Sequence, residues 1–314
     1  MPTREEVFQR IIQAKKSSQD EIRRSYIKDL AEYTGRDTIV YATAFTSKKL
    51  PNIPGYVVSI TNEDIQSFMS ALHNLKGNSL DLIIHSPGGS SEVVDQLVQY
   101  LRSKYNDIRA IIPQNAMSAA TMLACACDKI VMAKHSAIGP IDPQITFPTK
   151  NGHFTAPAQS ILDEFEQAKN EIIADPRTAP LWINKIQNYP QGFLNICQNT
   201  ISLSKDKVGE WLDKYMFKDI PEAEKKGREI ADWLGDAKEH KTHGRPIGIA
   251  KAKEIGLIIE DLEADQDFQE KVLSVFHSTV ATFEVTNCMK LVENHIGKGW
   301  YLVVEVKPIA NVNA

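Results

Sequence analysis

Ser118 is the first residue in this sequence that has the chemistry and the position of a nucleophile. It follows an apolar run at 110–112, typical of a buried strand, and begins a stretch of small residues at 118–127 that predicts a helix. A hydroxyl at that point would lie in the field of a helix N-terminus, with the next N–H, that of Ala119, free to donate. Serine is also a preferred helix N-cap, and for this position by itself capping is the favoured interpretation.

A pair of glycines after the preceding strand could supply hydrogen-bond donors. The apolar strand at 82–84 leads into the turn Ser86-Pro-Gly-Gly89. Glycine permits positive φ angles and lets a substrate oxygen approach backbone N–H groups closely. Most turns of this kind have no chemical role. A Gly-Gly turn after one strand and a serine turn after the next together favour a site that binds a developing oxyanion.

Both turns depend on a parallel sheet to position them. Apolar strands at 82–84, 110–112 and 130–133 alternate with helices at 91–105 and 118–127. Short apolar strands that alternate with helices are typical of a parallel sheet with crossover helices. The sequence therefore predicts an α/β core that presents the Gly-Gly turn at the carboxyl edge of its sheet.

Further elements flank this core on both sides. The first 34 residues predict an amphipathic helical region, followed by strands at 37–44 and 57–60. Beyond residue 148 the pattern becomes mostly helical. It includes a long helix at 265–295 and ends with a late strand at 300–306.

Composition excludes several classes of protein. The 314 residues are 42% apolar and 24% charged, and the net charge of −4 gives no strong field for nucleic acid or anionic lipid. Four scattered cysteines do not form a disulfide scaffold and suit a reducing compartment. No secretory signal opens the chain and no apolar run reaches the roughly 20 residues of a membrane span. We therefore expect a cytoplasmic protein, with peripheral membrane association left open.

Three motifs resemble those of the serine dehydrogenase proteinase family: Ser86-Pro-Gly-Gly89, Ala116-Met-Ser-Ala-Ala-Thr121 and Ser136-Ala-Ile-Gly-Pro-Ile-Asp-Pro-Gln144. This family is related to signal peptide peptidase A and, more distantly, to the Clp protease within the crotonase-like fold. The resemblance covers nearly the whole chain and implies an α/β, Clp/crotonase-like core of βα units with additional N- and C-terminal helices. The expected regions are an N-terminal helical region (1–36), the protease core (37–260) and a C-terminal helical extension with a late strand (261–314).

The resemblance implies that Ser118 is the nucleophile of a peptidase. It also implies that the backbone N–H groups of Gly89 and Ala119 form the oxyanion hole. Donors aimed at developing negative charge supply much of acyl-transfer catalysis, often about 10²–10³-fold for each donor.

The general base is the part of the pattern that departs from Clp-type enzymes. Those enzymes carry a histidine after the Ser-x-Ile strand, but here Ile141 occupies that place, beside Asp142. Enzymes similar to signal peptide peptidase A use a lysine from a later helix instead, and Lys169 aligns with it. Such a lysine must be neutral, so burial has to lower its pKa from about 10.4 to roughly 7–8. The alternative is a solvated helix lysine.

Four other polar residues are weaker candidates. His85 precedes the Gly-Gly turn and could orient the site by a hydrogen bond, although a structural role is the default. His135 follows the third strand and could be a base, but a packed histidine is favoured. Asp142 could orient a lysine, and capping of a turn is favoured. His243 is interpreted as structural.

These observations predict a serine endopeptidase that forms an acyl-enzyme on Ser118, with Lys169 as general base. Neither phosphate loop, dinucleotide fingerprint nor metal-ligand spacing is present, so we expect no metal and no organic cofactor. The alternatives are a crotonase-type acyl-thioester enzyme and a catalytically silent assembly or adaptor protein. Expected partners are a peptide or protein substrate and further copies of the chain in a homo-oligomer, with no nucleic acid. A membrane-associated substrate or partner is left open.

Overall fold

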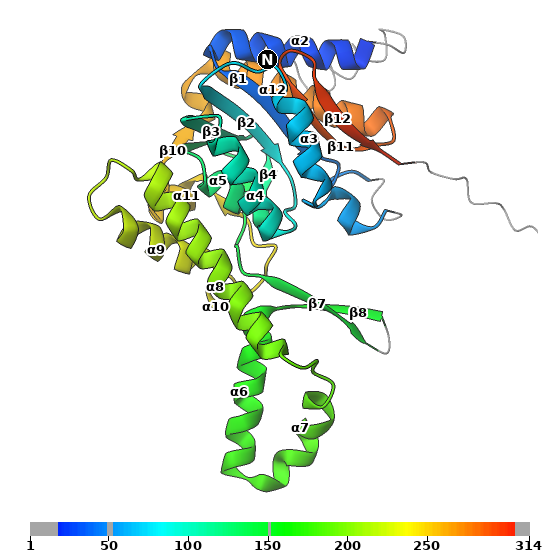
Figure 1. Ribbon diagram of the computed structural model, residues 1–314, viewed down its shortest axis with the longest axis vertical. Coiled ribbons are helices and arrows are strands. Elements are labelled where there is room, and N and C mark those ends of the chain that lie inside the picture. Colours follow the sequence, from blue (N-terminus) through cyan, green and yellow to red (C-terminus); the bar gives the residue numbers. More distant parts are fainter. Residues whose placement is uncertain (1–17, 49–52, 150–151, 305–314) are drawn as a thin grey trace, which may run out of the picture. The chain divides into compact units, whose positions relative to one another are not determined.

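The computed structural model of the chain describes residues 18–48, 53–149 and 152–304 (Figure 1). It forms two compact units. Unit 1 combines residues 1–138 with 248–314, and unit 2 consists of residues 139–247. Within the described ranges, no helix has both the length and the apolar character needed to cross a membrane.

Unit 1 is built on a seven-stranded sheet with the strand order β10-β5-β3-β2-β1-β11-β12. The strands are β1 (Asp37–Thr43), β2 (Ser79–His85), β3 (Asp107–Ile112), β5 (Lys129–Met132), β10 (Ile259–Asp261), β11 (Cys288–Asn294) and β12 (Gly299–Val303). The first five in this order, β10 to β1, are mutually parallel, and β11 is antiparallel to β1. Parallel strands end at one edge of the sheet, here called the carboxyl edge, and begin at the opposite amino edge.

Helices cover both faces of this sheet. They are α2 (Ser18–Thr34) and α12 (Gln266–Val285) on one face, with α3 (Glu63–Leu72), α4 (Ser91–Arg102) and α5 (Ala119–Cys125) on the other (Figure 1). Side chains alternate between the faces of a strand. Val40 and Ala42 accordingly join the core formed with α2 and α12, whereas the ring of Tyr41 packs 5.5 Å from that of Phe68 in α3. Because both faces are covered, the strands are apolar along most of their length.

Helix α4 shows how the sequence fixes the chain after the Gly-Gly turn. The Ser90 hydroxyl accepts a hydrogen bond from the N–H of Val93 at 3.2 Å and thereby caps the helix. Buried residues recur every three or four positions and form one apolar stripe: Val93, Val94, Leu97, Val98 and Leu101. The cap and the stripe together fix where the turn ends and the helix begins.

Short elements complete unit 1. They are η2 (Gly55–Val58), β4 (Asn115–Ala116), β6 (Ala137–Ile138), α11 (Ile249–Glu254) and η5 (Leu262–Ala264), and β9 (Ile247–Gly248) lies where the chain returns from unit 2. Strand β4 pairs in parallel with β6, so that Ala116 lies opposite Ile138. This pairing supports the segment that leads into Ser118.

Unit 2 is a β-hairpin followed by helices. Its elements are β7 (Gln144–Thr149), β8 (Gly152–Pro157), α6 (Ala158–Ala174), η3 (Pro176–Thr178), α7 (Ala179–Ile186), α8 (Phe193–Trp211), η4 (Leu212–Met216), α9 (Ala223–Leu234) and α10 (Ala237–His240). A small aromatic cluster holds the hairpin to α8, with the rings of Phe147 and Phe193 5.4 Å apart. This core is separate from the core of unit 1.

The predicted α/β core is confirmed, with corrections in its flanks. The strand expected at 57–60 is wrong: the chain forms the 3₁₀ helix η2, and only Ile60 makes an isolated bridge, to Gly89. The single helix expected at 265–295 is also wrong, because α12 ends at Val285 and β11 follows. Strand β11 is buried along its whole length, and its pairing with β1 overrides the helical pattern. Of the expected N-terminal helical region, residues 1–17 lie outside the described residues.

Candidate active site

The two turns predicted to carry chemistry lie side by side at the carboxyl edge. The N–H of Ser86 donates to the carbonyl oxygen of Asn115 at 3.1 Å, and the N–H of Met117 donates to the carbonyl oxygen of Ser86 at 2.9 Å. These two hydrogen bonds form a parallel bridge between Ser86 and Ala116. The bridge joins the Gly-Gly turn after β2 to the serine turn after β4.

Gly88 brings the backbone of one turn into contact with the serine of the other. Its φ is 97°, and a Cβ there would lie 2.6 Å from the carbonyl oxygen of Met117 and 2.8 Å from the Cβ of Ser118. No side chain fits that space. A glycine is therefore required for the two turns to approach this closely.

Ser118 has a strained backbone. Its φ of 53° and ψ of −121° lie outside the regions that residues with a side chain normally occupy, and it makes no side-chain cap hydrogen bond. The capping interpretation is therefore wrong, and the Ser118 carbonyl, not the hydroxyl, begins α5 by accepting from Met122. Such strain costs about 1–3 kcal/mol and clusters at functional sites. A sharp strand-to-helix turn that exposes a serine hydroxyl is the arrangement expected of a nucleophile.

Two backbone N–H groups beside Ser118 are left without an acceptor. The Gly88 N–H donates to the hydroxyl of Ser86 at 3.2 Å. The N–H groups of Gly89 and Ala119, by contrast, have no hydrogen-bond acceptor among the residues that the structure describes. Ala119 is the first residue of α5, where N–H groups have no partner inside the helix. These are the two donors that the resemblance assigns to an oxyanion hole.

Lys169 lies in unit 2, whereas Ser118 lies in unit 1. It belongs to α6, its side chain is 52% exposed, and its Nζ forms an ion pair with Glu166 at 3.0 Å. A half-exposed amine paired with a carboxylate lacks the burial that the predicted base requires. The serine–lysine dyad therefore stays a prediction.

The histidines near the predicted site occupy different environments. His85 ends β2 and is 1% exposed, with its ring 4.7 Å from that of Phe45 and 5.0 Å from that of Phe276. Burial lowers the pKa of His85 to about 3, so the imidazole is neutral at physiological pH. Its contact with Phe276 places it on the face covered by α12, whereas α5 covers the other face. His135 is exposed in the turn after β5.

Unit 2 holds a carboxylate–imidazole pair that the sequence did not reveal. The Nδ1 of His243 lies 2.8 Å from Oδ1 of Asp142, whose Oδ2 accepts a hydrogen bond from Gln144 at 2.8 Å. Asp142 is buried, and a buried carboxylate on Nδ1 is the arrangement that orients a histidine base. The two residues are 101 positions apart in the sequence, so no local spacing could have found the pair.

A metal site has no support from the described side chains. Among residues 18–48, 53–149 and 152–304, no three His, Cys, Asp or Glu residues form a group that could hold an ion. Cys125 and Cys127 are fully buried, and burial raises the pKa of both thiols to about 12. They are protonated core residues and not thiolate ligands.

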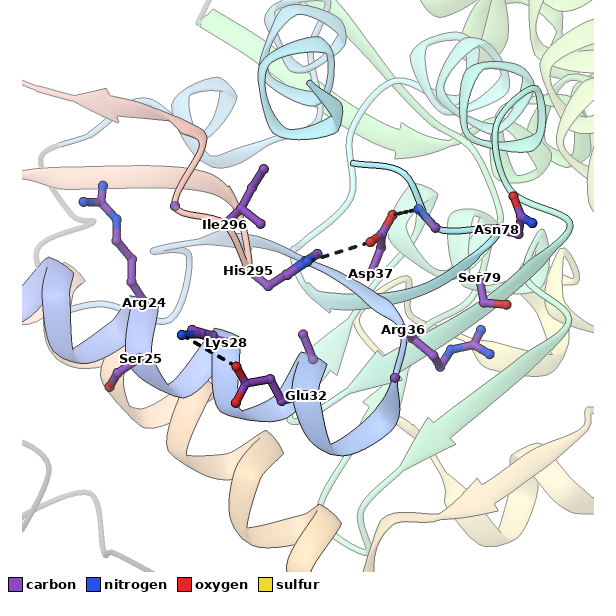
Figure 2. Close-up of a pocket in the computed structure, with 14 residues that line it drawn as sticks. Arg24, Ser25, Lys28, Glu32, Arg36, Asp37, Asn78, Ser79, His295 and Ile296 are labelled. Carbon is purple, nitrogen blue, oxygen red and sulfur yellow. Dashed lines mark hydrogen bonds and ion pairs between the residues drawn. The ribbon is translucent and has the colours of Figure 1, made fainter. Parts of the chain in front are cut away.

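A cavity of about 630 Å³ lies at the amino edge of the sheet, where its lining includes residues at the starts of β1 and β2 (Figure 2). Its lining is rich in charge, but the charged groups have partners inside the protein, either in the lining or, for Arg24 and Arg36, beyond it. Lys28 faces Glu32 at 3.6 Å, and His295 reaches from the end of β11 towards Asp37 at 3.8 Å. Internal pairing of this kind leaves little charge for a ligand to neutralise.

A protein-family model described as a ClpP-like SDH-type serine proteinase matches residues 8–277. The chain belongs to this family. Membership confirms the predicted fold class and supports a serine peptidase as the class of protein.

Similar proteins include two uncharacterized proteins of Methanocaldococcus jannaschii. One is 34% identical over 208 residues, which are 64% of this chain and 60% of that protein. The other is 31% identical over 199 residues, 63% of this chain and 58% of that protein. The matches thus span less than two thirds of the length of either relative.

Solved structures with similarity include two of a membrane-bound stomatin-specific protease called 1510-N. A serine-to-alanine mutant has a TM-score of 0.38 at 15% identity and covers 70% of this chain and 79% of that one. A lysine-to-alanine mutant in complex with a substrate peptide has a TM-score of 0.38 at 16% identity. The match covers 70% of this chain and 74% of that one.

Proposed function

We propose that this chain is a serine endopeptidase that forms an acyl-enzyme on Ser118, with Lys169 as general base. The observation that carries the proposal is the strained backbone of Ser118 beside the unengaged N–H groups of Gly89 and Ala119. Membership of a serine proteinase family supports the same chemistry.

The reaction follows from these groups. The Oγ of Ser118 attacks the carbonyl carbon of a peptide bond, and the electron pair of the C=O bond moves onto the oxygen. That oxyanion accepts hydrogen bonds from the N–H groups of Gly89 and Ala119. The base takes the Ser118 proton and delivers it to the leaving nitrogen as the C–N bond breaks. Water, activated by the same base, then hydrolyses the ester.

Lys169 can act as the base only if its surroundings change. Its ion pair with Glu166 has to break, and the amine has to be buried, before it can accept a proton from serine. Binding of substrate or of a second copy of the chain would supply that burial.

Degradation of casein by matched variants tests the proposal. We expect cleavage by the wild type and a loss of roughly 10³-fold or more in Ser118→Ala and in Lys169→Ala. Lys185→Ala is the matched control, since Lys185 is also a 52% exposed lysine paired with a glutamate, Glu164. Retained cleavage in Ser118→Ala would refute the acyl-enzyme. Loss in Ser118→Ala with retention in Lys169→Ala would keep the nucleophile and reopen the choice of base.

The two alternative functions give different results in the same assay. A crotonase-type enzyme would use the donors of Gly89 and Ala119 to polarise a thioester. It would bind acyl-CoA and tolerate Ser118→Ala. A silent assembly or adaptor protein would neither cleave casein nor bind acyl-CoA, and its cellular role would survive both substitutions.

We also propose a peptide or protein substrate, self-association into a homo-oligomer and a cytoplasmic location. The state of the cysteines supports the location, because all four are buried and free, as expected in a reducing compartment. Native mass measurement tests the oligomer. A single-chain mass at working concentration would contradict it.

A further inference from the structure

The Gly-Gly turn is held from its other side by the backbone of Ile60. The N–H of Ile60 donates to the carbonyl oxygen of Gly88 at 2.7 Å, and the N–H of Ser90 donates to the carbonyl oxygen of Ile60 at 3.0 Å. A Cβ at Gly89 would lie 2.4 Å from the backbone of Ile60, so only glycine allows this contact. The two hydrogen bonds flank Gly89 and leave its own N–H unengaged.

The register of this bridge therefore decides which N–H group is available. In the observed register, Gly88 and Ser90 make the hydrogen bonds and Gly89 presents its N–H. Hydrogen-bonding residues alternate along an extended segment. If the turn shifted by one residue relative to Ile60, the N–H of Gly89 would form a hydrogen bond with that backbone and would no longer be available. An oxyanion hole at this place needs Ile60 fixed in position.

A buried ion pair fixes the segment on both sides of Ile60. The Nζ of Lys290, in β11, donates to Oδ2 of Asp64 at 2.8 Å and to the carbonyl oxygen of Ser59 at 2.7 Å. The same Oδ2 of Asp64 accepts from the N–H of Thr61 at 2.7 Å. The residue before Ile60 and the residue after it are thus each bound to one member of the pair.

Stability alone does not explain this pair. The side chains of Lys290 and Asp64 are 1% and 0% exposed, so both charges have lost their hydration. The cost of removing two charges from water is comparable to their attraction, and apolar replacements of similar volume are often as stable. The pair also binds the backbone on both sides of Ile60, at Ser59 and Thr61, a positional effect that apolar side chains could not provide.

We propose that Lys290 and Asp64 are positioning residues for the oxyanion hole. By binding Ser59 and Thr61, they hold Ile60 in the register that leaves the Gly89 N–H free to meet the oxyanion. This inference rests on the proposed peptidase function. Neither residue touches Ser118, so they act through the backbone of the turn.

Two matched double variants test the proposal. Lys290→Met with Asp64→Leu removes both charges together, which avoids an unpaired buried charge. Arg23→Met with Glu293→Met is the control, because that pair is also fully buried, has a 2.7 Å contact and includes a residue of the same strand, β11. The control pair makes no hydrogen bond to the segment around Ile60 among the contacts described.

The first readout is the split between kcat and KM on a fluorogenic casein-derived peptide. We expect kcat to fall by about 10²–10³-fold in the Lys290/Asp64 variant, the effect of losing one oxyanion donor, with KM changed by less than about twofold. The control should keep kcat within about threefold. An unchanged kcat in the first variant, or an equal fall in both, would overturn the proposal.

The second readout is amide hydrogen exchange and does not require activity. The N–H groups of Ile60 and Ser90 form the bridge, so we expect their exchange to accelerate by about tenfold or more in the Lys290/Asp64 variant and to stay slow in the control. Undiminished protection at both amides would overturn the proposal. If the wild type cleaves no peptide, the peptidase function fails, while exchange at these two amides still decides whether the pair fixes the turn.

Discussion

The two edges of the central sheet in unit 1 differ in how fully their polar groups are hydrogen-bonded. At the amino edge, Asp81 is fully buried between Arg36 and Arg109, with hydrogen bonds of 2.7 Å to each guanidinium. At the carboxyl edge, Ser118 sits in a strained conformation and two N–H groups have no described acceptor. The buried carboxylate at the amino edge is hydrogen-bonded within the protein, whereas two N–H groups at the carboxyl edge remain available to bind a ligand.

The same difference separates the cavity of Figure 2 from the two turns around Ser118. The cavity of Figure 2 lies at the amino edge, where Asp37 accepts hydrogen bonds from the N–H of Gly77 and the hydroxyl of Tyr105, both at 2.9 Å. Polar groups that are satisfied inside the protein contribute to stability. Strain and unengaged donors persist only where the surrounding structure holds them in place.

The largest effect is expected from Asp81→Asn at the amino edge. It leaves two guanidinium groups facing a neutral side chain, and removing one partner of a buried pair costs about 3–5 kcal/mol. Urea unfolding measures this loss, and kcat per folded molecule should not change. Asp107→Asn is the control, since Asp107 is partly exposed and also pairs with Arg36; we expect it to cost less than about 1 kcal/mol. A large fall in kcat for Asp81→Asn would contradict the view that the amino edge contributes to stability and not to activity.

His85 gives an intermediate effect that depends on pH. Its folded pKa of about 3 lies below the usual 6.5, so between these values the unfolded chain binds a proton that the folded chain does not. Stability therefore falls as the pH drops below 6.5, by about 2 kcal/mol between pH 7 and pH 5 for this group.

Comparing unfolding free energies at pH 7 and pH 5 tests this contribution. His85→Leu should show a smaller loss of stability on acidification than the wild type, by about that 2 kcal/mol. Equal pH dependence in His85→Leu and the wild type would mean that the imidazole is not kept neutral by burial.

The smallest effect has the opposite sign and belongs to Ser118, the proposed nucleophile. Ser118→Gly should abolish cleavage and raise the free energy of unfolding by about 1 kcal/mol, because glycine occupies positive φ without strain. Ser118→Ala keeps the Cβ and should be inactive without this gain. Thermal unfolding of the two inactive variants compares them directly. Equal stabilities would show that the backbone at Ser118 stores no strain.

The two turns of the carboxyl edge could be placed from the sequence because the residues that form them are close together in the chain. Gly88, Gly89 and Ser118 occur in short turns after apolar strands. The residue types in a turn indicate which backbone conformations it can adopt. The capping interpretation of Ser118 failed because residue preferences cannot distinguish a cap from a strained turn. That distinction depends on the neighbouring turn, which contacts Ser118 through Gly88.

What the sequence did not predict depends on long-range pairing. The local pattern of strand β11 predicts the end of a helix, although its place is set by β1, about 250 residues earlier. Lys290 and Asp64 are separated by 226 positions, and Asp142 and His243 by 101. No local periodicity carries information about such partners.

The division of unit 1 between two distant parts of the chain has a consequence for synthesis. A ribosome makes Ser118 and both glycines of the turn well before β11, because residues 139–247 of unit 2 come in between. Domains whose contacts join distant segments fold late and slowly. A nascent chain that ends before residue 288 carries the serine without Lys290, and hence without the ion pair that binds Ser59 and Thr61. The order of translation thus delays formation of this ion pair, and of the contacts that hold Ile60 against the Gly-Gly turn, until the last strands emerge.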